Sequence, residues 1–504
     1  MFSKLLSHAI FRRSVSSLSS NTIPHIQAPS KDQASHIISY EKKEGGFNRV
    51  LVFLLDDGKR VVVRLPTRVA GPSTLTTNSE VATIAYVKSH TTIPVPHILA
   101  WSDDPSNPIG SEYIIMRHVA GVPLRERWLT MSGSQYTKCV QPACMTMKQL
   151  AALELPTYGS IYFENAPFDS TLKIPLIEGF CIGPHCSTTY WDCSSSQTKK
   201  GLTVPAGPWK NLAAYASGLI ANGHSKLPST SSQIDSSRPS YFGTIKEHRN
   251  LLNSAQNLLQ NLITQPQIEN ASVPTLLHAD LHTRNIYVSD EDPTLITCLI
   301  DWQSSSIEPA FIYANDMPDF AAAPEKSPEE ANARNEPPLS AQDIKMQKVA
   351  SYCNQVYEIC MEAFIPKMRV ARSVDQLLIR PFQYSHTSWR DSATAVRQEF
   401  LDLAENWNGL GLAGECPYSP TQAELEIHQK EHKAFEHVQE LKLMLVKLLH
   451  TDFDGWVPIE RWKETRRAHK EIFELARETA REGGDESMTE RDVKELWPFD
   501  DCTS

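Results

Sequence analysis

The chain has 504 residues, of which 41% are hydrophobic and 21% are charged, and its formal net charge at pH 7 is −10. This composition is ordinary for a globular protein, and the length exceeds what one hydrophobic core usually organises, so two or three packed lobes are expected. The mildly acidic balance disfavours a nucleic-acid partner, and the lack of an apolar run of about 18 residues disfavours a transmembrane segment.

The start of the chain differs in composition from the rest. It contains Lys4, Arg12 and Arg13, many serines and no acidic residue before Asp32, and its apolar residues recur at helical spacing. A basic, amphipathic and acid-free start is typical of a mitochondrial transit peptide, whereas a secretory signal needs an apolar stretch of about 7–15 residues. We predict that residues 1–35 hold a transit peptide and a linker and that the protein is mitochondrial; a solvated tail is the alternative.

Segments rich in β-branched and apolar residues dominate the next part of the chain. Residues 49–55 and 60–65 flank Asp57 and Gly58, a pair typical of a tight turn, and so predict a β-hairpin. The elements expected after it are a helix over 80–88 with N-cap residues at 76–79, an extended segment over 93–101 and a strand over 112–117. We therefore predict a small antiparallel sheet that carries one helix, over residues 36–118.

The remainder of the chain shows mostly helical periodicity. Helices are predicted over residues 140–155, 245–265, 421–450 and 459–481. Residues 156–245 are expected to be irregular, residues 315–341 to form a mobile surface loop, and residues 483–504 to form an acidic tail. The predicted fold class is α+β, with a larger, mostly helical region over residues 119–482.

The ten cysteines contain no C-x-x-C pair. Cys181, Cys186 and Cys193, with His185 between them, form the densest cluster, but their spacing fits no common zinc site. Reduced, mostly buried thiols are expected, and zinc ligation is the alternative.

The segment HADLHTRN at residues 278–285 concentrates polar groups in a short loop between two apolar, strand-like segments. Phosphoryl transfer uses an Asp that orients the acceptor hydroxyl and an Asn whose amide oxygen ligates magnesium, and Asp280 and Asn285 are spaced to share one cleft. Asp301 ends the next strand, and a hairpin would return it beside Asn285 as a second oxygen ligand. Taken singly, Asp301 could be a helix N-cap, Asn285 a turn residue and His278 a core histidine.

The run HADLHTRN followed by IDW at residues 300–302 resembles the aminoglycoside phosphotransferase family of the protein-kinase-like superfamily, whose motif is H-G-D-L-H-x-x-N and then I-D-[W/F]. The resemblance implies a bilobal protein-kinase-like fold, with ATP or another nucleoside triphosphate and Mg2+ as cofactors. In this interpretation His278 holds the catalytic loop, and Ala279 replaces the usual Gly. The catalytic residues that the resemblance implies are Asp280 and His278, and the metal ligands are Asn285 and Asp301.

In this superfamily a strand Lys contacts the nucleotide phosphates and pairs with a helix Glu. Here Arg64 stands where that Lys is expected, and Glu80 provides the helix carboxylate; an ordinary surface ion pair is the alternative. Gly45 and Gly46 stand where a phosphate-covering loop is expected, without the G-x-G-x-x-G pattern. The nucleotide-binding residues that the resemblance implies are Gly45, Gly46, Arg64, Glu80, Met116, Arg117 and His118.

Longer runs, among them LTTNSEVATIAYV, PFQYSHTSWRDS and GECPYSP, resemble a fungal mitochondrial branch of the same family. This likeness implies a mitochondrial location and a role in mitochondrial maintenance, with an unknown acceptor that is a small molecule or lipid-like. The candidates for lining the acceptor site, for which core packing is the alternative, are Tyr190, Trp191, Asp192, Trp302 and Trp389.

Two functional hypotheses remain open. The first is a magnesium-dependent phosphotransferase that acts on an alcohol group, and the second is a catalytically weak or inactive nucleotide-binding pseudokinase or scaffold. Arg64 in place of Lys and the short glycine loop favour the second. The complete set of Asp280, Asn285 and Asp301 favours the first, because a binding protein could dispense with Asp280.

Overall fold

The computed structural model describes residues 36–191, 205–229, 238–323, 340–451, 453, 455, 457, 461–481 and 489–499. The predicted transit peptide and linker, at residues 1–35, lie outside the described residues. Contacts divide the chain into two compact units. The first contains residues 47–215 and 266–374 with those up to Lys43, and the second contains residues 216–265, the segment 44–46 and the chain from Asp375 onward. The predicted lobe boundary at residue 118 stays a prediction.

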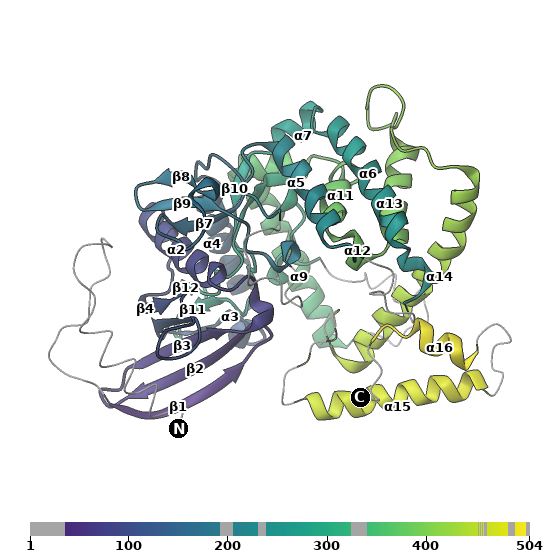
Figure 1. Ribbon diagram of the computed structural model, residues 1–504. Helices are drawn as coiled ribbons and strands as arrows, with labels where there is room; N and C mark the ends of the chain where they lie inside the picture. The colour runs from purple at the N-terminus through teal and green to yellow at the C-terminus, as the bar shows by residue number, and fades with distance from the viewer. Residues whose placement is uncertain are drawn as a thin grey trace. The chain divides into compact units, whose positions relative to one another are not determined.

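A five-stranded sheet forms the N-terminal part of the first unit (Figure 1). In the spatial order β1-β2-β3-β5-β4, its strands are β1 (Ile37–Glu44), β2 (Asn48–Leu55), β3 (Arg60–Pro66), β5 (Tyr113–Arg117) and β4 (Ile98–Ser102). The predicted hairpin is confirmed, because β2 and β3 pair antiparallel with Asn48 opposite Pro66. The sequence did not predict β1, whose side chains are almost all exposed and so lack the alternation of a half-buried strand.

The helix of this region, α2 (Leu75–His90), is longer than predicted. The prediction that residues 76–79 cap it is wrong, because these residues lie inside the helix and are buried. Glu112, distant in sequence, takes the capping role: its Oε1 accepts a hydrogen bond of 2.8 Å from the backbone N–H of Thr74. A carboxylate at this end is also favoured by the helix dipole. The cap anchors the helix that carries Glu80.

The segment 156–245, predicted to be irregular, contains a small sheet and a helix, and the prediction is wrong for these elements. They are the three-stranded sheet β7 (Ser160–Phe163), β9 (Phe180–Gly183) and β8 (Ile174–Ile177), and the helix α5 (Leu212–Ser225). The strands have four residues each, and such short segments give little periodic signal even when they bury residues such as Ile161 and Ile182. Residues 192–204 and 230–237 lie outside the described part of the chain.

The first unit contains further helices and short strands, and some of the strands flank the loop that carries the HADLHTRN motif. The helices are α3 (Leu124–Trp128), α4 (Gly133–Ala151), α7 (Pro266–Ala271), α9 (Ala341–Phe364) and α10 (Pro366–Arg372). The strands are β6 (Val122–Pro123), β10 (Pro274–Leu276), β11 (Ile286–Val288), β12 (Ile296–Leu299) and β13 (Ile307–Pro309). Because β10 pairs with β13 while β11 pairs with β12 and β6, the two ends of the loop are fixed in different sheets.

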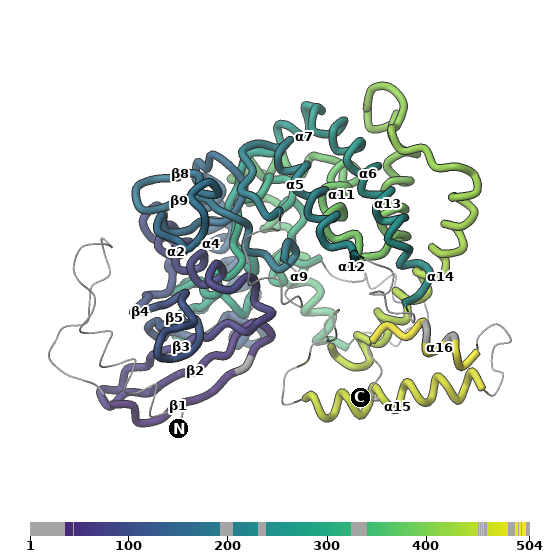
Figure 2. Tube along the Cα trace, viewed as in Figure 1, coloured from purple at the N-terminus to yellow at the C-terminus, as the bar shows by residue number. Residues whose placement is uncertain are grey.

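The second unit is helical in the described residues. Its helices are α6 (Ile245–Leu262), α11 (Gln376–Tyr384), α12 (Ser388–Asp391), α13 (Ala393–Asn406), α14 (Gln422–Leu449), α15 (Trp462–Arg481) and α16 (Glu490–Leu496). The helix predicted over 421–450 is confirmed, and Thr421 and Glu424 form the capping box that begins it. The predicted acidic tail contains α16, which packs against α15, as Figure 2 shows at the yellow end of the trace.

Among the described residues, no helix is both long and apolar enough to cross a membrane. The cysteines that the structure describes are free thiols, and all of them except Cys416 are buried. In the described ranges no three His, Cys, Asp or Glu side chains form a group that could hold a metal ion. His185 instead bonds Glu308, Cys186 lies beside the hydroxyl of Tyr162, and Cys193 lies outside the described residues.

Gly121 lies between β5 and β6 and allows a close approach of two chain segments. Its φ is 88°, and a Cβ atom there would lie 2.0 Å from the carbonyl oxygen of Val288 in β11. Any side chain at this position would therefore strain the backbone and push β6 away from β11.

We expect Gly121→Ala to lower the free energy of unfolding by about 2–4 kcal/mol, measured by urea denaturation. Gly110→Ala is the matched control, because Gly110 has a φ of 75° but no atom within 4 Å of the added Cβ. It should lose only about 1 kcal/mol, the cost of the left-handed backbone conformation. Equal losses in the two variants would show that the approach to Val288 imposes no constraint.

Candidate active site

His278 holds the start of the catalytic loop, residues 278–285. Its Nε2 lies 3.0 Å from the carbonyl oxygen of Ile300, and its Nδ1 accepts a hydrogen bond of 3.2 Å from the backbone N–H of Asp280. These contacts require a neutral ring with the proton on Nε2, and burial lowers the pKa of His278, which favours that form. The ring edge also packs on Trp302, with 4.7 Å between centroids. Such a residue positions the loop, as the resemblance implies.

The carboxylate of Asp280 lies among hydrogen-bond donors. Arg284 Nη2 donates to both of its oxygens, at 2.7 and 2.9 Å, and Asn285 Nδ2 donates to Oδ2 at 2.7 Å. His282 Nε2 lies 3.1 Å from Oδ1. The side chain is still 29% exposed, so part of the carboxylate remains open to solvent. Its donors come from different side chains and hold it in one orientation.

Asp319, in the short 3-10 helix η8 (Asp319–Ala321), fixes the middle of the catalytic loop. Its Oδ1 accepts a hydrogen bond of 2.9 Å from the backbone N–H of Thr283, and its Oδ2 accepts one of 2.6 Å from the Thr283 hydroxyl. Its backbone N–H donates to His282 Nδ1 at 3.2 Å. Asp319 Oδ1 lies 3.5 Å from the same nitrogen, and hydrogen bonding to this carboxylate raises the pKa of His282. Nδ1 accepts from the backbone N–H only when it carries no proton, and it can donate to the carboxylate only when it carries one.

Asp319 was not predicted from the sequence, because residues 315–341 were expected to form a mobile surface loop. That prediction is wrong for residues 315–323, where Phe320 and Ala321 are buried. An aromatic residue directly after Asp319 was the available signal that this segment packs inward. Residues 324–339 lie outside the described residues.

The two predicted metal ligands lie at neighbouring strand ends. The backbone N–H of Ile300 donates to the carbonyl oxygen of Asn285 at 3.0 Å, which joins the start of β11 to the end of β12. Asn285 Nδ2 directs its hydrogens to Oδ2 and the carbonyl oxygen of Asp280, at 2.7 and 2.9 Å. This orientation leaves the amide oxygen of Asn285 as the atom that can act as a ligand.

Asp301 combines an unusual backbone conformation with a carboxylate that lies beside a cation. Its φ of 65° lies in the left-handed region, which non-glycine residues rarely adopt. Its Oδ1 is buried and has no aligned hydrogen-bond donor among the described residues, but Arg64 Nη1 lies 3.1 Å from this oxygen and pairs with its charge. The side chain as a whole is 38% exposed, so the carboxylate remains open to solvent. Magnesium prefers carboxylate and amide oxygens, so Asp301 and Asn285 fit this ion.

Arg64 and Glu80 form a buried ion pair, not a surface one. Arg64 is 8% and Glu80 is 3% exposed, and Arg64 Nη1 lies 2.5 Å from Glu80 Oε1 and 3.1 Å from Asp301 Oδ1. Burial alone would lower the pKa of Arg64, but the carboxylates of Glu80 and Asp301 outweigh it and raise this pKa. The guanidinium therefore remains charged beside the predicted metal ligand.

The other predicted nucleotide-binding residues lie at the end of β5 and in the connection between β1 and β2. The backbone N–H groups of Arg117 and His118 are already bonded, to the carbonyl oxygens of His97 and Arg60 at 2.9 and 3.1 Å. A contact from Met116, Arg117 or His118 to adenine would need another backbone group, and it stays a prediction. The glycines at 45 and 46 lie in the connection between β1 and β2, and their place at the phosphates also stays a prediction.

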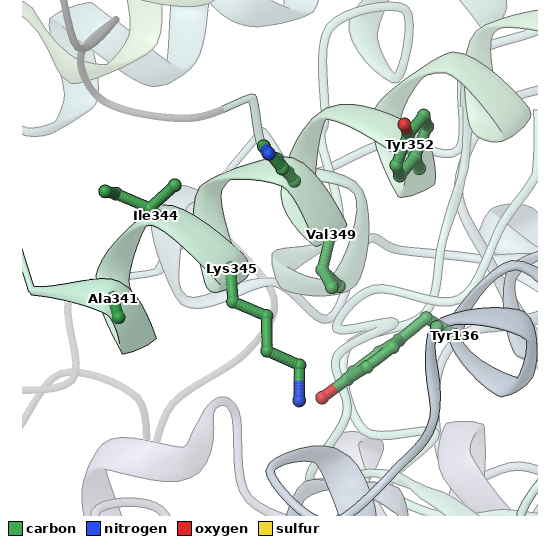
Figure 3. Close-up of a pocket in the computed structure, with 8 residues that line it drawn as sticks. Tyr136, Ala341, Ile344, Lys345, Val349 and Tyr352 are labelled. Atoms are coloured by element: carbon green, nitrogen blue, oxygen red, sulfur yellow. The ribbon is translucent and has the colours of Figure 1, made fainter.

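The aromatic candidates for the acceptor site are mostly core residues. Tyr190, Trp191 and Trp302 are at most 7% exposed, which fits the alternative of core packing. Trp389 belongs to the second unit, and Asp192 lies outside the described residues. Residues of α4 and α9 line a hollow of about 350 Å³. Figure 3 shows Lys345 of α9 pointing toward Tyr136 of α4 in this hollow. None of the predicted site residues lines it.

We expect the hydrogen bonds that Thr283 donates to Asp319 to limit the mobility of the catalytic loop. In Asp319→Ala the backbone N–H of Thr283 loses its acceptor, so amide exchange in peptides that cover residues 278–288 should be about tenfold faster or more. Hydrogen–deuterium exchange with mass spectrometry measures this rate.

Asp292→Ala is the matched control, because Asp292 accepts the same pair of bonds from the N–H and hydroxyl of Thr294, at 2.9 and 2.8 Å. These bonds lie in the exposed turn after β11, so exchange in the catalytic loop should not change. Unchanged exchange in Asp319→Ala would show that the loop does not depend on Asp319.

The phosphotransferase enzyme family model matches residues 237–312, a segment that includes the catalytic loop and Asp301. A putative aminoglycoside phosphotransferase of Ralstonia eutropha is 12% identical, with 79% of this chain and 98% of that chain covered and a TM-score of 0.35. A ternary complex of the phosphotransferase APH(4)-Ia with ADP and hygromycin B is 16% identical, with 72% and 94% covered and a TM-score of 0.33. At these TM-scores the structural overlap is only partial.

Relatives in fungi extend over most of the chain. A subtelomeric hrmA-associated cluster protein of Aspergillus fumigatus is 25% identical over 91% of this chain and 96% of its own length. Altered inheritance of mitochondria protein 9 of Lachancea thermotolerans is 22% identical over 84% of this chain and 74% of its own length. Several relatives are named as mitochondrial proteins, in agreement with the predicted location. The chain is thus similar over most of its length to the altered inheritance of mitochondria 9 proteins, and its catalytic-loop segment matches the phosphotransferase enzyme family.

Proposed function

We propose that the chain is a magnesium-dependent phosphotransferase that moves the terminal phosphoryl group of ATP, or of another nucleoside triphosphate, to a hydroxyl group of a mitochondrial acceptor. The observation that carries the proposal is that Asn285, whose amide is fixed against Asp280, lies at the strand end next to the one that carries Asp301. The buried Arg64–Glu80 pair contacts Asp301 in the same unit. We infer that a nucleotide phosphate site and an acceptor-orienting carboxylate meet there.

In the proposed reaction Asp280 orients the acceptor hydroxyl and takes its proton. As the new bond between the hydroxyl oxygen and phosphorus forms, the bond from phosphorus to the nucleoside diphosphate breaks, and the diphosphate leaves with the electron pair. Asn285 and Asp301 would hold Mg2+, which, when bound, neutralises charge on the phosphate oxygens. Arg64 adds a fixed positive charge beside them.

Arg284 imposes a condition on substrate binding. It contacts both carboxylate oxygens of Asp280, and an acceptor hydroxyl needs one of those oxygens. Because the Arg284 side chain is 59% exposed, giving up one contact costs little. We infer that the acceptor displaces Arg284 from one oxygen when it binds. The acceptor itself is proposed to be a small molecule or a lipid-like alcohol.

The alternative, a nucleotide-binding pseudokinase or scaffold in mitochondrial maintenance, is favoured by one contact. Arg64 Nη1 lies 3.1 Å from Asp301 Oδ1, and a cation at that distance competes with Mg2+ for the carboxylate. The strength of this competition decides between turnover and binding alone.

We expect Mg2+ and ATP together to raise the melting temperature of the wild-type protein, because ligand binding to the folded state stabilises it. Asp280→Asn should keep this shift, since Asp280 is not among the proposed metal ligands. It should lower transfer of labelled γ-phosphate to a mitochondrial metabolite extract by about 100-fold or more. Differential scanning fluorimetry and thin-layer separation of labelled products provide the two measurements.

Asp290→Asn is the control for this experiment, because Asp290 is exposed in the turn between β11 and β12 and should transfer phosphate at the wild-type rate. No stabilisation of the wild type by Mg2+ and ATP would exclude both nucleotide hypotheses. Stabilisation without any transfer, in the wild type and Asp280→Asn alike, would favour the pseudokinase.

The mitochondrial location predicts that residues 1–35 fused to a fluorescent reporter direct it to mitochondria. Replacing Arg12 and Arg13 by Glu changes the net charge of this segment from positive to negative and should leave the reporter diffuse. A diffuse signal from the unaltered fusion would contradict the assignment of a transit peptide.

A further inference from the structure

Gln303, two residues after Asp301, is bonded at both ends of its amide. Its Oε1 accepts hydrogen bonds from Arg64 Nη2 at 2.5 Å and from Asn48 Nδ2 at 2.7 Å, and its Nε2 donates to the carbonyl oxygen of Ala70 at 2.8 Å. The donor contact to Ala70 fixes which end of the amide is nitrogen, so the oxygen must face Arg64. The orientation of this amide is therefore determined by three partners.

The two terminal nitrogens of Arg64 therefore contact different partners. Nη1 lies at the carboxylates of Glu80 and Asp301, whereas Nη2 lies at Gln303. A guanidinium is planar, and its donors diverge at fixed angles, so anchoring Nη2 sets the plane in which Nη1 lies. A lysine has one nitrogen and cannot make both sets of contacts from the same position.

We infer that Gln303 is the positioning residue that allows an arginine to contact the nucleotide phosphates where the superfamily has a lysine. This inference rests on the proposed function. Gln303 holds the guanidinium plane so that Nη1 stays at Glu80 and the proposed metal ligand Asp301, where the triphosphate would bind, and Asn48 and Ala70 hold Gln303. Arg64 and Gln303 thus act as one unit, and the exchange of Arg64 for Lys is not conservative in this chain.

A purely structural role is the competing explanation, since Gln303 also joins the segment after β12 to β2 and to the 3-10 helix η1 (Arg68–Ala70). The two roles differ in what they change. Loss of a structural link lowers stability and affects all ligands alike. Loss of the positioning contact weakens binding of the triphosphate specifically, and this effect disappears when Arg64 itself has been replaced.

The experiment uses full-length wild type, Gln303→Leu, Arg64→Lys and the double variant, with Gln355→Leu as control because Gln355 is exposed on α9. Calorimetric titration with Mg2+ and ATP should show affinity about tenfold weaker in Gln303→Leu, with adenosine binding unchanged. In the Arg64→Lys background, Gln303→Leu should add less than a twofold change, because the group that it positions is gone. Gln355→Leu should match the wild type.

The wild type, the two single variants and the double variant without nucleotide give a second readout. Their melting temperatures should be non-additive, with the loss in the double variant smaller than the sum of the two single losses. Should Gln303→Leu fail to fold, Asn48→Ala serves in its place, because it removes one partner of Gln303 and should weaken ATP binding in the same direction.

The outcomes separate this inference from the proposed function. If the wild type does not bind Mg2+ and ATP, the proposed function is wrong, while the melting temperatures still show whether Arg64 and Gln303 are coupled. If the wild type binds and Gln303→Leu binds equally well, the positioning role is wrong. Equal losses for adenosine and ATP, or an equal loss in the Arg64→Lys background, would also overturn it.

Discussion

The buried ion pair between Arg64 and Glu80 is the constraint on which the first unit depends. A guanidinium that is 8% exposed cannot remain unpaired, and removing one partner of such a pair usually costs about 3–5 kcal/mol. The pair ties β3 to α2, and the contacts of Arg64 with Asp301 and Gln303 add the segment after β12. Elements that are more than 200 residues apart in sequence are therefore held in fixed positions relative to one another.

Polar groups near a hydrophobic core need partners, and the polar groups of the catalytic loop have them. His278 bonds the backbone at both ring nitrogens, Asp319 accepts from Thr283, and Asn285 donates to Asp280. Rigidity of the loop follows from this network, because each bond is supplied by a different segment of the unit. The Oδ1 of Asp301 differs from these groups, because its partner is the charge of Arg64 and not an aligned hydrogen-bond donor.

The parts of the structure that sequence could predict are those determined locally. The hairpin of β2 and β3 follows from two β-rich runs around a turn, and α14 from its periodicity and its Thr421 cap. The loop at 278–285 follows from the order and spacing of its polar residues. Each of these features is encoded within about thirty residues or fewer, so no tertiary information was needed.

The features that sequence missed depend on distant partners. The cap of α2 is Glu112, which lies far beyond the helix, and so the residues at 76–79 were misread as caps. Asp319 and Gln303 act on residues 36 and 239 positions away, and neither belongs to a motif. Single-sequence reasoning found the proposed site residues that belong to the motif, including His278, and it missed Asp319 and Gln303, whose partners are distant in sequence.

The left-handed backbone of Asp301 has a consequence for directed evolution. A non-glycine residue at a φ of 65° costs about 1 kcal/mol or more, and glycine would remove that cost. Glycine would also remove the carboxylate that lies 3.1 Å from the buried Arg64 guanidinium, and a buried charge that loses a partner destabilises the folded state. In a library selected only for heat resistance, the frequency of glycine at position 301 would therefore show which of these two effects is larger.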